Sequence, residues 1–141
     1  MFPKFQVVLY NSNLTNLHNL TGAQLGAYFG YTIATCDING DGLDDILIGA
    51  PMWTDFTLMG AFETGRVYAV YQDKNVSSKA CLKRINNQRK DLEDIFKHRF
   101  RNWDTLNGEN NKARFGTSIA SLGNINLDGK TGESPDGYQG E

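Results

Sequence analysis

The sequence lacks any apolar run of about 18 residues, the length that a membrane-spanning helix needs. Its first residues, MFPKFQVVLYNSN, also lack the apolar core of a secretory signal peptide. The formal net charge of −2 gives no electrostatic case for nucleic acid or for an anionic membrane surface as a partner. Hydrophobic residues nevertheless make up 40% of the 141 residues, which excludes a disordered chain.

Residues that serve common catalytic mechanisms are scarce. The two histidines, His18 and His98, have no companion residues in the sequence for a metal site or an activated nucleophile. The serines occur in no nucleophile-elbow context, and the glycines form no phosphate-binding loop. The two cysteines, Cys36 and Cys81, lack metal-type spacing and permit one disulfide, although Cys36 is also typical of a small buried side chain on a strand. The sequence therefore gives no indication of an enzyme.

An internal repeat is present. The segment LTGAQLGAYFGYTIATCDINGDG, from Leu20, resembles LNGENNKARFGTSIASLGNINLDG, from Leu106. At a constant spacing of 86 residues, Leu20, Gly22, Phe29, Gly30, Ile33 and Ala34 match Leu106, Gly108, Phe115, Gly116, Ile119 and Ala120. After one inserted residue, Asp37, Asn39, Asp41 and Gly42 match Asn124, Asn126, Asp128 and Gly129. The chain holds one complete repeat and the start of another.

The residues of the repeat predict short strands. Residues 45–50, DILIGA, form an apolar run bounded by glycine and proline, which is typical of a strand buried on both faces. Residues 31–36 alternate around Ile33, while 65–71 and 4–10 are rich in valine and tyrosine. One sheet of four such strands would expose both of its faces, so it needs neighbouring sheets. The pattern predicts an antiparallel, all-β, propeller-like fold.

Residues 77–101 interrupt this pattern with a basic, charged segment. Helical spacing connects four of its apolar residues, Leu92, Ile95, Phe96 and Phe100. We expect a short amphipathic helix or an ordered loop inserted between two outer strands. The segment offers either a partner surface or, as charge runs more commonly do, a solvated loop whose aromatic side chains lie on the sheet.

The stretch CDINGDGLDDILIGAP gathers oxygen-bearing side chains just ahead of an apolar strand. Residues at positions 1, 3 and 5 of a tight loop can face one centre, and glycine at position 6 lets the residue at position 7 offer its carbonyl. An EF-hand would close with glutamate at position 12, where this chain has Ile48. The loop instead closes at position 9 and joins two strands. We predict a Ca²⁺ site with ligands Asp37, Asn39, Asp41, the Leu43 carbonyl and Asp45.

The alternative is an acidic turn without an ion. Carboxylates about 4 Å apart repel by several kcal/mol at an effective dielectric near 20, which makes that alternative costly. Mg²⁺ suits the loop less well, because it prefers a smaller, octahedral, water-rich site. The second copy of the loop keeps one of these carboxylates, Asp128, and has Lys130 at the carbonyl position and Gly132 at the closing position. We expect the second copy not to hold Ca²⁺.

Three N-glycosylation acceptor triplets begin at Asn13, Asn19 and Asn75. Three such triplets in turn-like surroundings favour a secreted or cell-surface protein, although asparagine-rich loops also produce them by accident.

Taken together, AYFGYTIATCDINGDGLDDILIGAP and ETGRVYAVY resemble the FG-GAP repeat. Phe29-Gly30 and Gly49-Ala50-Pro51 are its two named halves, and the acidic loop lies between them. The likeness is to the seven-bladed propeller of integrin alpha subunits, over residues 17–72 and again over 103–129. It implies a single-pass cell-surface adhesion receptor that pairs with an integrin beta subunit and binds extracellular matrix or cell-surface ligands. The five predicted loop ligands carry over as calcium ligands, and no ligand-contact residue does.

This resemblance divides the chain into four parts. Residues 1–16 end one repeat, 17–78 form a full repeat with the calcium loop, 79–102 are the charged insert, and 103–141 begin a truncated or aberrant repeat. The last part is expected to be truncated or aberrant, because KTGESPDGYQGE replaces the expected apolar strand. The alternative function is that of another secreted or surface FG-GAP protein, including one whose propeller is appended to a hydrolase domain.

Overall fold

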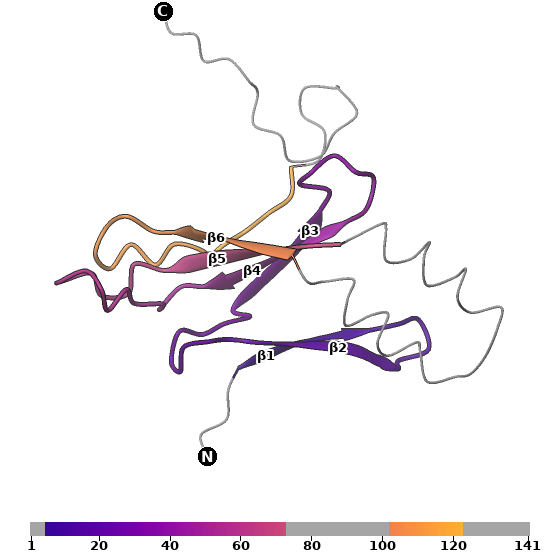
Figure 1. Cartoon of the computed structure of the whole chain (residues 1–141), viewed down its shortest axis with the longest axis horizontal. Helices are drawn as coiled ribbons and strands as arrows, with labels where there is room; N and C mark the ends of the chain where they lie inside the picture. Colours follow the sequence, from indigo (N-terminus) through magenta and orange to yellow (C-terminus); the bar gives the residue numbers. More distant parts are fainter. Residues whose placement is uncertain (1–4, 73–101, 123–141) are drawn as a thin grey trace, which may run out of the picture.

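The computed structural model describes residues 5–72 and 102–122, which contain six strands (Figure 1). A two-stranded antiparallel sheet pairs β1 (Gln6–Tyr10) with β2 (Asn16–Thr21). A four-stranded antiparallel sheet has the order β3 (Thr32–Cys36), β4 (Asp45–Ala50), β5 (Arg66–Tyr71) and β6 (Asn102–Asn107). Within these residues there is no helix, and therefore none that could cross a membrane. The predicted all-β class is confirmed.

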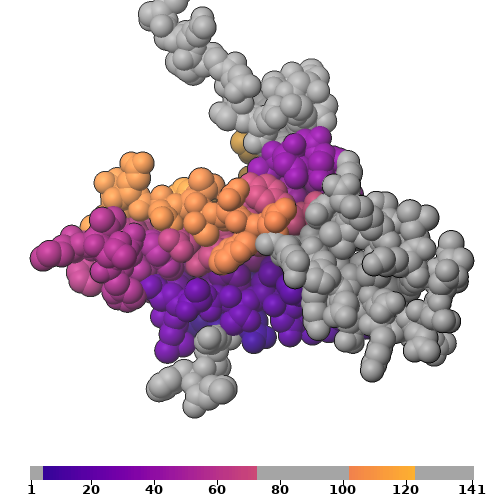
Figure 2. Space-filling view, in the orientation of Figure 1, coloured from indigo at the N-terminus to yellow at the C-terminus, as the bar shows by residue number. Residues whose placement is uncertain are grey.

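Four strands lie where the sequence predicts them, and two do not carry the expected pattern. β4 is buried on both faces, as its apolar run predicts. β2 and β6, with the sequences NLHNLT and NWDTLN, were not predicted as strands. Each lies at the edge of its sheet, so its outward side chains meet water and need no apolar alternation. In Figure 2, the orange surface of residues 102–122 lies on the side of the molecule away from the indigo β1–β2 hairpin.

The core lies between the two sheets, which Figure 1 shows stacked face to face. The Phe29 ring meets the edge of Tyr68 at 5.1 Å between centroids, and Tyr68 stacks on Trp103 at 5.7 Å. The Arg66 guanidinium lies 3.5 Å from the centroid of Trp53, which extends this aromatic packing. The buried cluster comprises Val7, Ala27, Phe29, Ile46, Ile48, Ala50, Trp53, Tyr68 and Val70.

The sequence repeat reappears as a repeat of structure. A spacing of 86 residues carries the bounds of β2 onto those of β6. In each copy a glycine with left-handed φ, 88° at Gly30 and 87° at Gly116, follows the phenylalanine that recurs in the repeat. A Cβ on Gly30 would lie 3.0 Å from Val7, and one on Gly116 would lie 2.9 Å from Val67. Each Phe-Gly pair therefore lies against the last hairpin of the preceding sheet.

Sheet and sequence repeat are out of phase. The predicted parts 17–78 and 103–141 each begin one residue into the last strand of a sheet, β2 or β6. Each sequence repeat thus runs from the outer strand of one sheet into the inner strands of the next, as expected for part of a propeller. The division of the chain at these residues stays a prediction. The predicted helix around Leu92–Phe100 lies outside the residues that the structure describes.

Gly49 marks the closest crossing of the second Phe-Gly segment over the four-stranded sheet. A Cβ added to Gly49 would overlap the carbonyl oxygen of Gly116 and the hydroxyl of Thr32. The Thr32 hydroxyl donates a hydrogen bond to that carbonyl oxygen at 2.7 Å, so neither group can move without a loss. We expect Gly49→Ala to lower the free energy of unfolding of the protein by about 1–3 kcal/mol, the usual cost of overpacking.

Chemical denaturation measures this loss, and Gly60→Ala is the control. Gly60 has a left-handed φ of 83° but no atom within 4 Å of an added Cβ. Its replacement should cost only the backbone strain, about 1 kcal/mol. If Gly49→Ala were no more damaging than Gly60→Ala, the close crossing would not be a packing constraint.

Candidate calcium site

The acidic loop connects β3 to β4. It begins after Cys36 and ends at Asp45, and these two residues form the last pair of the β3–β4 ladder. Gly40 and Gly42 adopt left-handed φ angles of 72° and 81°, which turn the backbone back toward β4. Figure 1 shows this loop at the end of the four-stranded sheet opposite the β4–β5 connection.

The side-chain oxygens of the loop turn inward onto its own amides. The Asp41 amide donates to Asp37 Oδ1 and to Asn39 Oδ1, each at 3.0 Å. The Gly42 amide donates to Asp37 Oδ2 at 2.6 Å, and the Leu43 amide donates to Asp41 Oδ1 at 2.8 Å. The loop is therefore shaped by the same residues that the sequence predicts as calcium ligands.

Asp45 is fully buried, with 0% of its surface exposed. Its Oδ2 accepts a hydrogen bond from the Ile38 amide at 3.0 Å, and its Oδ1 accepts one from the Gln72 amide at 2.9 Å. The carboxylate thus ties the loop to the end of β5. Within residues 5–72 and 102–122 no ion pair joins Asp45 to a basic side chain, and its two hydrogen-bond donors there are neutral backbone amides.

The donor chemistry of the loop fits a hard cation. Side-chain carboxylates, an amide oxygen and a backbone carbonyl are oxygen ligands of the kind that Ca²⁺ binds at about 2.3–2.6 Å. In residues 5–72 and 102–122, however, no three His, Cys, Asp or Glu side chains are grouped closely enough to hold a metal ion. The structure brings the five predicted ligands into one short loop but leaves their carboxylates turned to backbone amides. The ligand assignment stays a prediction.

Two titratable groups near this end of the sheet are perturbed. Burial raises the pKa of the Cys36 thiol, and a hydrogen bond with Ser121 opposes that rise. Three nearby carboxylates raise this pKa further: Asp45, Asp44 and Asp37. Burial also raises the pKa of Tyr71, as does its hydrogen bond with Asp104. Cys36 is a free, buried thiol, as expected for a small side chain on a strand.

The other predicted site residues are scattered. Asn13 lies in the turn between β1 and β2, and Asn19 lies within β2. Asn75, Cys81 and the second acidic loop lie outside the residues that the structure describes. Sequence reasoning did not anticipate the bond from Gln72 to Asp45, because a backbone donor leaves no signature in the residue type.

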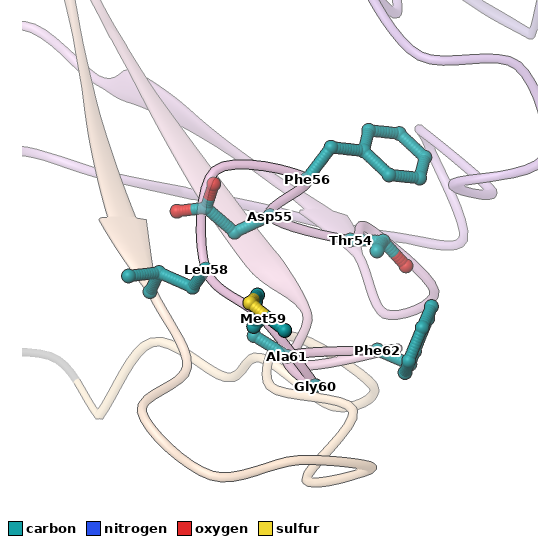
Figure 3. A pocket seen from close by; sticks show the side chains of 8 residues that line it. All are labelled: Thr54, Asp55, Phe56, Leu58, Met59, Gly60, Ala61 and Phe62. Atoms are coloured by element: carbon teal, nitrogen blue, oxygen red, sulfur yellow. The ribbon is translucent and has the colours of Figure 1, made fainter.

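The β4–β5 connection, at the other end of the sheet, lines a pocket of about 280 Å³ (Figure 3). Figure 3 shows mostly apolar side chains around this pocket, and the polar Asp55 accepts hydrogen bonds from the amide and hydroxyl of Thr57. These bonds, the hydroxyl first, lower the pKa of Asp55. The connection offers no set of converging polar groups that could perform catalysis. Its lining residues are Thr54, Asp55, Phe56, Leu58, Met59, Gly60, Ala61 and Phe62.

The chain is similar in sequence to a known repeat family and to known proteins. Residues 29–70 match the FG-GAP repeat. Integrin alpha-PS2 of Drosophila melanogaster is 38% identical over 128 residues, which are 88% of this chain and 8% of that protein. Integrin alpha-5 of Xenopus laevis is 36% identical over 126 residues, and integrin alpha-V of Gallus gallus is 38% identical over 125. These stretches cover 89% and 87% of this chain, and the chain spans 10% of the length of each of those two relatives.

The two hydrogen bonds of Asp45 should stabilise the fold even when no ion is bound. Asp45→Asn keeps the shape of the side chain, but its amide nitrogen cannot accept a hydrogen bond. One of two partly buried backbone donors, the N–H of Ile38 or of Gln72, then loses its acceptor, which costs about 1 kcal/mol. We expect that loss in the free energy of unfolding, measured by denaturant titration with a calcium chelator present.

Glu109→Gln is the matched control, because it makes the same carboxylate-to-amide change at an exposed position away from the loop. Its effect should stay within about 0.5 kcal/mol, as for ordinary surface substitutions. Equal effects of the two variants would show that the tie from Asp45 to Gln72 does not stabilise the fold.

Proposed function

Residues 29–70 form an FG-GAP repeat and the chain is an integrin-alpha-like segment; on this premise we propose that it is a calcium-stabilised propeller part of a cell-surface adhesion receptor. The observation that carries the calcium part of the proposal is the buried carboxylate of Asp45. An ionised carboxylate with no opposite charge in a protein interior is strongly unfavourable. A divalent cation in the adjacent loop supplies that charge.

Asp37, Asn39, Asp41, the Leu43 carbonyl and Asp45 would hold the ion. When bound, Ca²⁺ contributes electrostatic stabilisation and no reaction. The residues themselves already fix the loop: Asp37, Asn39 and Asp41 accept hydrogen bonds from its amides. Asp45 joins it to Gln72 at the end of β5. Binding therefore stabilises the junction of three strands, and it stabilises the folded chain by mass action because the unfolded chain has no assembled site.

The partners follow from the whole protein to which such a segment belongs. We propose pairing with an integrin beta subunit, binding to an extracellular matrix or cell-surface ligand, and a location on the outer side of the plasma membrane. The named relatives support this assignment, because each is an integrin alpha subunit. The acceptor triplets at Asn13 and Asn19, both exposed, agree with an extracellular location. We propose no enzymatic activity for the segment.

Calcium titration tests the ion-binding part of the proposal. We expect the intact protein to gain thermal stability in millimolar Ca²⁺, and Asp41→Ala to remove one bound ion. The loss follows because Asp41 is a predicted ligand and also accepts the Leu43 amide that shapes the loop. Isothermal titration and thermal unfolding with Ca²⁺ and with Mg²⁺ measure the effect.

Asp128→Ala is the matched control, because Asp128 occupies the position of Asp41 in the second copy of the loop, for which we expect no ion. The number of bound ions should be unchanged in that variant. Binding that survives Asp41→Ala, or an equal loss in Asp128→Ala, would contradict the assignment of the ligands.

Recovery from the cell surface tests the receptor part. The full-length protein, tagged in its native cells and labelled with a membrane-impermeant biotin reagent, should be isolated in a near-equimolar complex with an integrin beta subunit. Quantitative mass spectrometry of the complex provides the measurement. Release into the medium without a beta subunit would instead support the alternative, a secreted FG-GAP protein joined to another domain.

A further inference from the structure

The β4–β5 connection is held near both of its ends by the Phe-Gly segments of the two repeats. The first Phe-Gly segment, residues 22–30, bonds to the start of the connection, and the second, residues 108–116, bonds to its end. Figure 1 shows the second segment beside the connection, at the end of the sheet away from the acidic loop. The connection therefore lies between two segments that are 86 residues apart in the chain.

The first anchor is the side chain of Gln24, which pairs with the backbone of Thr54. The Thr54 amide donates to Gln24 Oε1 at 2.8 Å, and Gln24 Nε2 donates to the Thr54 carbonyl at 2.9 Å. One side-chain amide thus satisfies both backbone groups of a single residue. The Met52 amide adds a bond to the Ala27 carbonyl at 3.2 Å. These bonds fix the start of the connection to the first Phe-Gly segment.

The second anchor is a set of backbone bonds between the end of the connection and the second Phe-Gly segment, with a parallel bridge between Gly65 and Phe115. Three amides of that segment donate to three carbonyls of the connection at 2.8–3.0 Å: Lys112 to Phe62, Arg114 to Glu63 and Phe115 to Thr64. The Arg114 guanidinium also pairs with the Glu63 carboxylate at 2.9 Å. Both side chains are partly exposed, so the pair supplements the backbone bonds rather than replacing them.

The second anchor holds an unfavourable backbone conformation. Three non-glycine residues in the bonded stretches have left-handed φ angles, 48° at Glu63, 58° at Lys112 and 52° at Arg114. Such angles cost free energy in residues with a side chain, and they persist where surrounding contacts determine the conformation. The contacts here include the backbone bonds between the connection and the second segment. Release of the connection would therefore leave the second segment in a conformation that a free chain avoids.

A direct bond joins the two anchored ends of the connection. The Glu63 amide donates to the Thr54 hydroxyl at 3.1 Å. Thr54 is thus bonded to Gln24 through its backbone and to Glu63 through its side chain, and Glu63 is bonded in turn to Arg114. The hydrogen bonds form a continuous path from one Phe-Gly segment to the other.

The tip of the connection gives a thermodynamic reason for the two anchors to act together. Phe56, Leu58 and Met59 are all exposed there, so burial does little to order the loop. Fixing its backbone costs conformational entropy. Once one anchor has ordered the loop, the other forms at a lower entropic cost, and the two anchors become cooperative.

We propose that the β4–β5 connection couples the local stability of the two repeats, so that release of either anchor weakens the other. The hydrogen bonds described for the acidic loop include no residue of this connection, and the coupling therefore does not require an ion. It goes beyond the proposed calcium stabilisation, which acts at the opposite end of the sheet. In a propeller such coupling transmits the opening of one repeat to the next.

Hydrogen exchange of the full-length protein, measured by peptide mass spectrometry, tests the coupling. Gln24→Ala removes both side-chain bonds of the first anchor. We expect exchange in residues 50–56 to become about fivefold faster, which is the factor that one hydrogen bond contributes. We also expect exchange in residues 110–116, at the other anchor, to become about twofold faster. Gln24→Glu, which keeps the acceptor and loses the donor, should have a smaller effect at both places.

The reverse substitution should act in the same way, because a coupling free energy is reciprocal. Arg114→Ala removes the guanidinium bonds to Glu63 and should speed exchange in residues 50–56 as well as in its own segment. The double variant with Gln24→Ala should show less than the sum of the two effects. Glu109→Gln is the matched control, since this exposed residue of the second segment takes part in none of these bonds, and it should change neither region.

Faster exchange confined to the substituted anchor would show that each anchor acts alone and would overturn the proposal. Residues 45–50 of β4 report opening of the whole sheet, and their exchange should stay unchanged. An equal acceleration there would also contradict the proposal, because the variants would then destabilise the fold in general. The same measurements in a calcium chelator should give the same coupling, and a coupling that disappears with the ion would contradict the independence of the two ends.

Discussion

The structure depends on the covering of one β-sheet face by another sheet. A four-stranded sheet with an apolar strand such as β4, buried on both faces, is not stable when either face meets water. Here the β1–β2 hairpin covers one face, with Phe29 and Tyr68 in edge contact between the sheets. The two glycines at Gly30 and Gly116 allow the chain to cross close to a neighbouring valine, where a side chain would hold the layers apart. The repeat keeps a glycine at this point because the packing distance requires it.

The sequence predicted the strands whose side chains are buried between the two sheets. β4 and β5 bury apolar residues, so their runs DILIGA and RVYAVY identify them. β2 and β6 escaped prediction because edge strands are held by backbone pairing, which polar residues such as those in NWDTLN perform equally well. The repeat at a spacing of 86 residues was visible from six matched residues. Its phase relative to the sheets was not, because pairing between distant strands leaves no local signal.

In the acidic loop, too, the residue types could be interpreted from the sequence, whereas contacts between distant segments could not. The spacing of Asp37, Asn39 and Asp41 predicts oxygen ligands on one short loop, and the structure places them together. The burial of Asp45 and its bond to the Gln72 amide could not be inferred from spacing, because they arise from the pairing of β4 with β5. Asp45 therefore has two roles. Its carboxylate is the last member of the predicted ligand set, and its hydrogen bond with the Gln72 N–H holds the loop against the sheet.

The same packing argument extends to the face of the sheet opposite the hairpin. Leu20 packs against the core between the two sheets, and its repeat equivalent, Leu106, is 56% exposed. Val7 and Val67 are likewise equivalent, and the second Phe-Gly segment already lies against Val67 as the first lies against Val7. The face of Val67 and Leu106 therefore repeats the apolar surface that the four-stranded sheet covers on the first hairpin. A further sheet of the same kind fits there, and repetition of that step around an axis gives the closed array that a propeller requires.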